Sequence, residues 1–286
     1  MSNQVEGVIL KGIGGFYYVH TGRRQIECKA GGRLRLNRRE KPAVGDRVMV
    51  EERGEEGLIT QILPRKNFLQ RPPIANIDQL FIVASQASPV TDPYLIDKVS
   101  VIALRQGIQP ILVLNKQDVN PSQDFRLIYE KAGFPVLSTS AETGEGVEEL
   151  RQMLRGKVSA FTGNSGIGKS SLLNRLEEGV LMETGSISRI SRGRHTTRRV
   201  ELFFVAEGYL ADTPGFSSFD ISRMEHIPKE ELERYFPEFE PFLGQCRFSG
   251  CAHCKEPDCA VDQGAREGAI APSRLESYRK LYEEMA

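Results

Sequence analysis

The pattern of apolar and polar residues predicts a β-domain at the start of the chain. Short alternating segments in residues 4–64 are separated by glycine-rich turns, and no helical periodicity interrupts them. The expected strands are 5–10, 15–20, 25–29, 47–52 and 58–63. Five short strands in so few residues favour a small barrel, for which an OB-like barrel is the best match.

Residues 74–215 show a different pattern, in which apolar strands alternate with helical periodicity. The expected strands are 79–85, 110–115, 135–139 and 158–162, and the expected helices are 93–106, 125–132, 147–154 and 168–176. Strands that alternate with helices in this way form a parallel sheet covered by helices. Two further strands, 200–206 and 209–211, are close enough in sequence to form a hairpin.

The remaining segments complete a three-domain organisation. Residues 64–73 are basic and contain proline, as expected of a linker. Residues 221–286 contain a cysteine cluster and a helical pattern over 273–284. We therefore expect an N-terminal barrel domain over 1–64, a central α/β domain over 65–220 and a C-terminal helical, metal-binding domain over 221–286.

Composition narrows the class of protein. Of the 286 residues, 40% are hydrophobic and 27% are charged, which is ordinary for a globular protein. The apolar runs are far shorter than the ~20 residues that a membrane helix needs, and the first eleven residues lack the pattern of a secretory leader. We therefore expect a cytoplasmic protein that makes no membrane contact. A monomer is the working expectation, although the sequence itself does not determine the oligomeric state.

A phosphate-binding motif follows the expected strand 158–162. It matches G-x-x-x-x-G-K-[ST] at every fixed position with Gly163, Asn164, Ser165, Gly166, Ile167, Gly168, Lys169 and Ser170. Such a loop surrounds phosphate oxygens with backbone N–H groups at the positive end of a helix, which here includes Ser171. Lys169 is expected to reach the β- and γ-phosphates, and the Ser170 hydroxyl to ligate Mg²⁺. The flanking strand and helix make a plain glycine-rich turn the weaker interpretation.

Asp212, Thr213, Pro214 and Gly215 close the expected strand 209–211. The carboxylate of Asp212 can hold Mg²⁺ through water. The N–H of Gly215 can contact a γ-phosphate and release it after hydrolysis. These residues could also form a plain turn, but the phosphate-binding motif favours the functional interpretation.

A guanine-recognition motif comes earlier in the chain, at the end of the expected strand 110–115. It consists of Asn115, Lys116, Gln117 and Asp118. The Asp118 carboxylate can accept hydrogen bonds from the N1–H and the exocyclic amine of guanine, whereas adenine would leave it unpaired. Asn115 is expected to brace neighbouring loops, and the Lys116 stem to cover the base. Ser140 and Ala141 are expected to form a second base-contacting loop, with a backbone N–H directed toward guanine O6.

The two motifs occur in permuted order. GTPases of this kind usually carry the phosphate loop first and the guanine motif last, whereas here Asn115 precedes Gly163. A sheet tolerates this order if its usual ends are joined and the chain is opened after the Asp212 strand. With a barrel before this domain and a cysteine cluster after it, the whole chain resembles the circularly permuted small-ribosomal-subunit biogenesis GTPases (the RsgA/YjeQ/YloQ family).

This resemblance implies a GTPase that hydrolyses GTP to GDP and phosphate, is stimulated by the small (30S) ribosomal subunit and acts late in the maturation of that subunit by binding its rRNA. It also implies that the segment around Thr197 is the first switch, in which Thr197 ligates Mg²⁺ when GTP is bound. Phe216 stands where many GTPases carry a glutamine that orients the attacking water. Because phenylalanine can neither donate nor accept a hydrogen bond, we expect slow intrinsic hydrolysis and a partner that completes the site. His195 and His226 are candidates for a replacement catalytic group.

Four of the five cysteines fall within fourteen residues. In a cytosolic chain such a cluster indicates metal binding and not disulfides. The spacing Cys246-x4-Cys251-x-His253-x5-Cys259 offers three thiolates and one imidazole, the closed tetrahedral set of a structural Zn²⁺. It is similar to the zinc site of the family, whose pattern passes over Cys254. Cys28 is expected to be an ordinary thiol.

Basic residues are concentrated over 23–41, where eight lysines and arginines stand against two acids. The densest group lies near an expected loop of the barrel and consists of Arg33, Arg35, Arg38, Arg39 and Lys41. OB barrels bind nucleic acid through such surfaces, with phosphate contacts that read little sequence. A solvated basic loop is an equal alternative for an isolated barrel, but the family resemblance favours RNA binding.

Three other functions remain open from the sequence. The chain could be an RNA-binding module in which GTP is a structural ligand, or a ribosome-independent RNA-modification or signalling GTPase. The phosphate loop alone would also allow an ATPase. In the main hypothesis, residues 216–222 connect the Asp212–Gly215 turn directly to the cysteine domain, so that loss of the γ-phosphate could reorient this domain and lower rRNA affinity.

Overall fold

A computed structural model describes residues 4–32, 34, 41–70, 73–121, 123–184, 200–212 and 227–285, with the backbone alone for 178–184 and 212. These residues form two compact units. One contains the N-terminal barrel and a later hairpin. The other contains the loops and helices around the two nucleotide motifs, together with the C-terminal helices. Within this described part of the chain, no helix combines the length and the apolar character that crossing a membrane requires.

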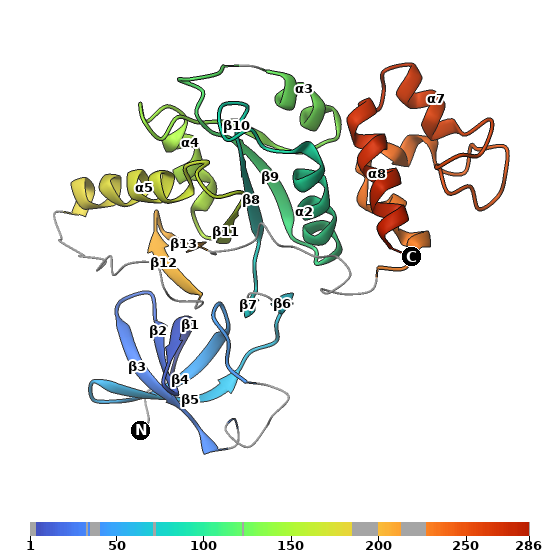
Figure 1. Cartoon of the computed structure of the whole chain (residues 1–286). Coiled ribbons are helices and arrows are strands. Elements are labelled where there is room, and N and C mark those ends of the chain that lie inside the picture. The colour runs from blue at the N-terminus through green and yellow to red at the C-terminus, as the bar shows by residue number, and fades with distance from the viewer. Residues whose placement is uncertain are drawn as a thin grey trace. The chain divides into compact units, whose positions relative to one another are not determined.

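The N-terminal strands close into a five-stranded barrel (Figure 1). The strands are β1 (Gln4–Ile13), β2 (Phe16–His20), β3 (Gln25–Ala30), β4 (Arg47–Arg53) and β5 (Glu56–Ile62). Their order is β1-β2-β3-β5-β4, and β3 is parallel to β5. This connectivity confirms the predicted OB-like barrel.

Alternate residues of these strands fill the barrel, as the period of two in the sequence predicts. The core consists of Ile9, Val19, Ile26, Cys28, Val48, Val50 and Ile59. Cys28 belongs to it with an exposed fraction of only 1%. Burial, with a smaller contribution from Glu27, raises the pKa of the Cys28 thiol to about 11. This cysteine is therefore an unreactive packing residue.

Residues 64–73, expected as a linker, include part of a small antiparallel ribbon. In it, β6 (Phe68–Gln70) pairs with β7 (Pro73–Ala75). Leu69 and Ile74 are buried. The side chain of Asn67 both accepts from the N–H of Ile77 (2.9 Å) and donates to its carbonyl (2.7 Å), which fixes the end of the ribbon. The chain therefore leaves the barrel along a defined path.

A six-stranded sheet with the order β10-β9-β8-β11-β13-β12 forms the centre of the α/β part. Its strands are β8 (Gln79–Ala84), β9 (Gln109–Leu114), β10 (Val136–Ser138), β11 (Val158–Thr162), β12 (Glu201–Val205) and β13 (Gly208–Asp212). β9 and β10 are parallel, and β12 and β13 form the predicted antiparallel hairpin. Every residue of β8 is buried, as expected of a central strand whose two faces are both covered.

Four helices accompany this sheet. They are α2 (Pro93–Arg105), α3 (Asp124–Lys131), α4 (Val147–Leu154) and α5 (Lys169–Thr184). In Figure 1, α2 and α3 lie on one side of the sheet and α4 and α5 on the other. The first begins where the Asp92 carboxylate accepts from the N–H of Tyr94 (2.9 Å) and Pro93 occupies the first helical position. The helix after the phosphate loop continues beyond the predicted 168–176 to Thr184.

The barrel contacts the β12–β13 hairpin through paired side chains. The Lys11 ammonium lies 2.8 Å from a carboxylate oxygen of Glu201. His20 Nδ1 lies 2.9 Å from the Tyr209 hydroxyl oxygen, and its ring is 4.3 Å from that of Phe204. Burial lowers the pKa of His20, which favours the neutral form of its ring. These contacts join the barrel to the β12–β13 hairpin, whose second strand ends at Asp212.

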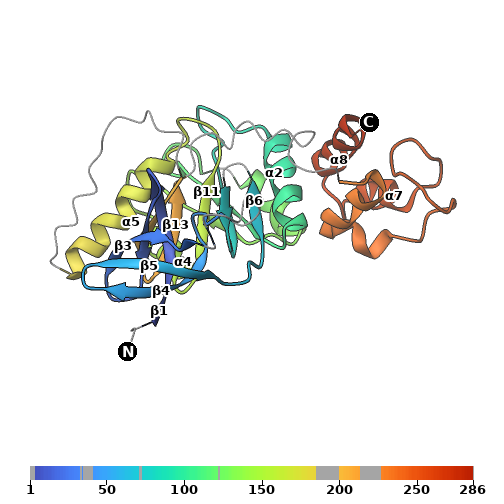
Figure 2. The same cartoon turned by 90° about the horizontal axis from the view of Figure 1, so that it is seen from below.

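The C-terminal part is helical and contains more helix than the sequence predicts. Its elements are η2 (Lys229–Tyr235), η3 (Pro237–Phe242), α7 (Ala260–Arg266) and α8 (Pro272–Glu284). Only α8 has a clear periodic pattern, and η2 and η3 are short 3₁₀ turns. α8 lies beside α2 both in Figure 1 and in the turned view of Figure 2.

A buried ion cluster joins α8 to α2. The Arg274 guanidinium is fully buried and lies 2.7 Å from Asp97 Oδ1. It also donates two hydrogen bonds to the Glu238 carboxylate, at 2.6 and 3.1 Å. Tyr129 donates its hydroxyl to Asp97 (2.8 Å), and Phe236 stacks under the guanidinium at 4.5 Å. Because the two buried carboxylates share one cation, removing Arg274 would leave both of them buried without it.

Replacing Arg274 with Met should lower the free energy of unfolding by about 3–5 kcal/mol, because two carboxylates would stay buried without their cation. Urea unfolding followed by circular dichroism measures this loss. The matched control is Arg266→Met, which breaks an exposed pair with Asp262 and should cost less than ~1 kcal/mol. Equal losses in the two variants would contradict the role given to the buried cluster.

Candidate nucleotide site and metal centre

The phosphate-binding motif forms a tight loop between β11 and α5. Its backbone needs glycine at Gly163, where φ is 137° and a Cβ would lie 2.3 Å from the carbonyl oxygen of Val83. The Lys169 ammonium lies inside the loop and donates to the carbonyls of Gly163 (2.7 Å) and Asn164 (2.6 Å). The loop therefore presents an ammonium and a helix N-terminus to the same small space, an arrangement that suits phosphate.

The other residues of the motif lie on the same loop or at the start of α5. Ser165 and Gly166 form the turn, Ile167 is buried beneath it, and Gly168 precedes the helix. Lys169, Ser170 and Ser171 are the first residues of α5. Each of these predicted phosphate-binding residues thus lies on the loop or in the first turn of the helix.

The Asn115 side chain joins the phosphate loop to the segment 139–141, the second of the two predicted base-recognition segments. Its Nδ2 donates to the carbonyl of Ile167 (2.8 Å). Its Oδ1 accepts from the Thr139 hydroxyl (3.2 Å) and from the N–H of Ala141 (3.1 Å). Asn115 is 2% exposed. A Cβ on Gly168 would lie 2.2 Å from Asn115 Nδ2, so the glycine permits this close approach.

The guanine motif turns sharply after β9. Lys116 adopts a left-handed backbone with φ 66°, and its ammonium donates to the carbonyl of Ser88 (2.6 Å). The N–H of Gln117 donates to the carbonyl of Thr139 (3.2 Å), which places the motif against the end of β10. The Asp118 carboxylate accepts from the Ser140 hydroxyl at 2.6 Å. The Asp118 carboxylate thus contacts a segment that lies 22 positions further along the chain.

The predicted switch residues are only partly within the described structure. Asp212 ends β13, where its backbone pairs with Glu201. Thr197 and Gly215 lie outside the described residues, as do His195, Phe216 and His226. The basic residues Arg33, Arg35, Arg38 and Arg39 also lie outside them, whereas Lys41 lies within.

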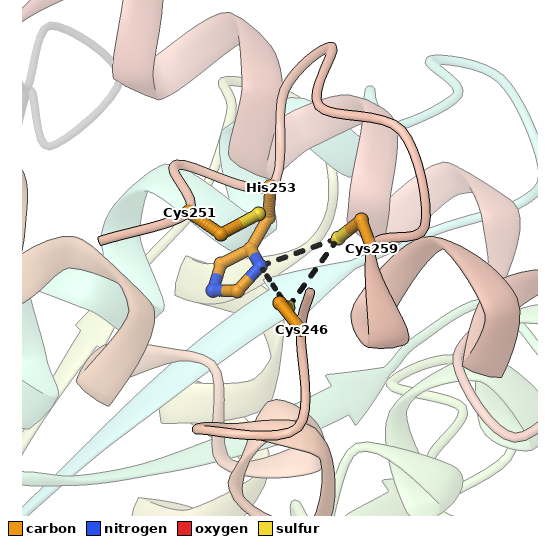
Figure 3. A group of neighbouring side chains, drawn as sticks. All are labelled: Cys246, Cys251, His253 and Cys259. Carbon is orange, nitrogen blue, oxygen red and sulfur yellow. Dashed lines mark hydrogen bonds between the residues drawn. The ribbon is translucent and has the colours of Figure 1, made fainter. Parts of the chain in front are cut away.

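The predicted metal ligands converge in the C-terminal part (Figure 3). One ligand atom from each of Cys246, Cys251, His253 and Cys259 lies within 4.8 Å of all the others. His253 Nδ1 is 3.6 Å from Cys246 Sγ and 3.3 Å from Cys259 Sγ, and these two sulfurs are 3.9 Å apart. Cys254 is not a member of this group of four.

These separations fit a tetrahedral zinc ion. Zn–S bonds of about 2.3 Å and Zn–N bonds of about 2.0–2.1 Å place the sulfurs about 3.8 Å apart and each sulfur about 3.5 Å from the nitrogen. Burial raises the pKa of the Cys251 and Cys259 thiols. Burial therefore disfavours the charged thiolate form, and a cation among the sulfurs would be needed to stabilise it. Both the spacing and the chemistry of the donors suit Zn²⁺.

Neighbouring residues hold the ligands in place. The outer nitrogen of His253, Nε2, lies 2.9 Å from a carboxylate oxygen of Glu233 on η2. The Glu256 carboxylate accepts backbone N–H bonds from residues 252, 254 and 255. Although burial alone would raise it, these bonds hold the pKa of Glu256 at about 2. From α8, the Tyr278 hydroxyl donates to the carbonyl of Ala252 and Arg279 to that of His253.

Two contributors to these sites carry no signal in the sequence. Glu233 precedes His253 by twenty positions in an acidic stretch, and nothing distinguishes it from Glu230 or Glu231. Arg175 on α5 contacts the loop after Ser140, although its position in a helix predicts only an exposed side chain. Both contacts depend on tertiary structure.

Comparison with known proteins places the chain in a family. The model of the RsgA GTPase family matches residues 62–222, and that of the RsgA N-terminal domain matches residues 6–59. A relative from Caldanaerobacter subterraneus, named small ribosomal subunit biogenesis GTPase RsgA, is 45% identical over 99% of this chain and 96% of its own length. A relative of the same name from Geobacillus thermodenitrificans is 42% identical over 98% and 97%.

Solved structures agree with these matches. The crystal structure of YjeQ from Thermotoga maritima has a TM-score of 0.82 and 35% identity and covers 99% of each chain. The structure of YloQ, described as a circularly permuted GTPase, has a TM-score of 0.81 and 32% identity and covers 99% of this chain and 95% of its own.

The fold and the motif order define a circularly permuted P-loop GTPase domain, preceded by an OB-like barrel and followed by a helical part with a Cys₃His cluster. The guanine motif follows β9 and the phosphate loop follows β11, although the sheet places both near its centre. The chain belongs to the RsgA GTPase family, whose members are GTP hydrolases. The predicted fold class and the family resemblance are confirmed.

Replacing Glu233 with Ala should speed the loss of Zn²⁺ by roughly ten-fold or more, because the His253 ring would lose the acceptor that fixes its orientation. Transfer of the metal from the zinc-loaded protein to a coloured chelator measures the rate. Glu230→Ala, an exposed change on the same element, should release zinc at the wild-type rate. If the two variants release zinc equally fast, Glu233 does not support the ligand.

Proposed function

We propose that this chain binds GTP with Mg²⁺ at one site and hydrolyses it to GDP and phosphate. The observation that carries this proposal is the Asn115 side chain, which bonds the phosphate loop at Ile167 and the base loop at Ala141. A single nucleotide fits this arrangement: its phosphates would contact the phosphate loop, its base would contact the base loop, and Asn115 already joins these two loops. The family assignment supports the same reaction.

The phosphate end would be held by the loop from Gly163 to Ser170. Lys169 would exchange the loop carbonyls for the β- and γ-phosphates. Ser170, with Thr197 from the first switch, would ligate Mg²⁺, which neutralises charge on the phosphates when bound. Asp212 and the N–H of Gly215 would respond to the γ-phosphate and its loss.

The base end would be read by hydrogen bonds. Asp118 would accept from the N1–H and the amine of guanine, as an acceptor-only carboxylate can. Its present bond from Ser140 keeps the carboxylate beside the second loop. The N–H of Ala141 would face guanine O6. The Lys116 stem, whose ammonium donates to the carbonyl of Ser88, would cover the ring. Adenine would leave Asp118 unpaired, which argues against an ATPase.

We further propose one structural Zn²⁺ bound by Cys246, Cys251, His253 and Cys259. The four donors leave no open position, so the ion would stabilise the C-terminal fold and take no part in hydrolysis. Its ligands are carried by the segment that follows η2 and η3, which are too short to fix these loops alone.

The proposed partner is the small (30S) ribosomal subunit and its rRNA. The names of the relatives, small ribosomal subunit biogenesis GTPase RsgA, support this partner. The barrel supports it as well, through a cavity of about 450 Å³ whose lining includes Phe16, Phe68 and Lys41. The Lys29 ammonium lies 5.1 Å from the centre of the Phe16 ring, and the Arg65 guanidinium 4.5 Å from that of Phe68. Such cations beside aromatic rings suit single-stranded or looped RNA.

The subunit would also complete the catalytic site. Phe216 cannot orient water, and either His195 or His226, or a group of the subunit, would do so in its place. The chain would act late in subunit maturation, in the cytoplasm, as a monomer without membrane contact. The three domains proposed from the sequence are 1–64, 65–220 and 221–286. The barrel and the zinc-binding domain, which flank the GTPase domain in the sequence, would then both bind rRNA.

Small ribosomal subunits should raise GTP turnover by at least ~10-fold, because a partner that supplies a missing catalytic group gains roughly 10³-fold or more in other GTPases. Phosphate release is measured with and without purified subunits. Lys169→Ala, the control, should show turnover under neither condition. If the subunits leave the turnover unchanged, a ribosome-independent signalling or RNA-modification GTPase would be favoured. If Lys169→Ala keeps its cellular function, GTP would be favoured as a structural ligand.

A further inference from the structure

The loop that follows β10 is held from two opposite sides. On one side, the Ser140 hydroxyl and the Ala141 N–H donate to Asp118 and Asn115. On the other side, the Arg175 guanidinium donates from Nε to the carbonyl of Ala141 (2.9 Å) and from Nη2 to the carbonyl of Glu142 (2.5 Å). The backbone that would meet guanine O6 is therefore fixed by a side chain that lies outside both nucleotide motifs.

The loop has no comparable support of its own. It folds back through backbone bonds from Ser140 to Glu145 (3.0 Å) and from Gly144 to Ser140 (2.8 Å). Gly146, with φ 70°, allows the turn to press against the carbonyl of Ser138, only 2.0 Å from where a Cβ would lie. These bonds close the loop on itself but do not attach it to the phosphate side.

Arg175 adds a second attachment to the phosphate side, beside the one that Asn115 makes through Ile167 and Ala141. It lies on α5, the helix whose first turn carries Lys169 and Ser170, and its two hydrogen bonds span the distance to the base loop. A guanidinium presents two N–H donors in a fixed plane, which matches two successive carbonyls better than a lysine ammonium could.

We propose that Arg175 is a positioning residue for guanine recognition: it holds the 140–142 backbone against the phosphate-loop helix so that the Ala141 N–H meets O6 of the base. This inference rests on the proposed guanine site. It assigns Arg175 to the O6 contact only, whereas Asp118 reads the N1–H and the amine. The two contacts can be separated by the choice of nucleotide.

The test measures dissociation constants of three diphosphates for the full-length protein. GDP carries O6, N1–H and the amine, IDP lacks the amine, and 2-aminopurine riboside diphosphate lacks O6 and N1–H. For Arg175→Met, the dissociation constants of GDP and IDP should rise by the same factor, about 5–10-fold, as expected for one lost hydrogen bond. That of the 2-aminopurine nucleotide should change less than about 2-fold.

The selectivity for GDP over the 2-aminopurine nucleotide should therefore fall, while the ratio of GDP to IDP stays constant. Arg175→Lys should restore part of the loss, because its single ammonium group can still donate to one of the two carbonyls. Arg155→Met removes another exposed arginine and should alter none of the three constants. If Arg175→Met leaves all three unchanged, or weakens all three equally, the inference is overturned. A wild-type protein that binds no guanine nucleotide would instead contradict the proposed site itself.

Discussion

The side-chain amide of Asn115 is the interaction on which the nucleotide site depends. One buried group donates to the phosphate loop and accepts from the segments that precede and form the second base loop. Because the amide nitrogen and the amide oxygen are both hydrogen-bonded and almost none of the residue is exposed, moving these loops apart would break buried hydrogen bonds. The loops therefore have one favourable arrangement, and a ligand that needs both ends finds them in register.

The site requires only that these loops meet in space, and this explains why a permuted chain order is compatible with it. The order β10-β9-β8-β11-β13-β12 sets the guanine motif and the phosphate loop at strand ends near the middle of the sheet, regardless of which comes first in sequence. What permutation changes is the connection beyond Asp212, which now leads to η2 and the cysteine cluster. That part is fastened to α2 by Arg274 and Asp97, and α2 begins just after the residues that Lys116 and Asn120 contact. Packed elements thus run from the Cys₃His cluster to the guanine motif.

The sequence identifies local features well and long-range contacts hardly at all. The phosphate loop, the guanine motif and the four metal ligands are recognisable because their chemistry fixes residue type and spacing. The strands of the barrel are recognisable from their alternation. Arg274 and Asp97, in contrast, are 177 positions apart, and each looks like an ordinary surface charge in its helix. The 3₁₀ turns η2 and η3 were not predicted because a proline-rich acidic stretch has no periodicity, and Glu233 and Arg175 gain their roles only from folding.

Asp118 is proposed to read the base of the same nucleotide whose phosphates Lys169 holds. Replacing the Asp118 carboxylate with an amide tests this most directly. In Asp118→Asn the side chain can donate as well as accept, which suits xanthine, where a carbonyl replaces the amine of guanine. Dissociation constants for GDP and XDP should then reverse, with GDP weakened by at least ~100-fold and XDP preferred, while Asp124→Asn, an exposed change, keeps the wild-type order. An Asp118→Asn protein that still binds GDP with unchanged affinity would contradict the account.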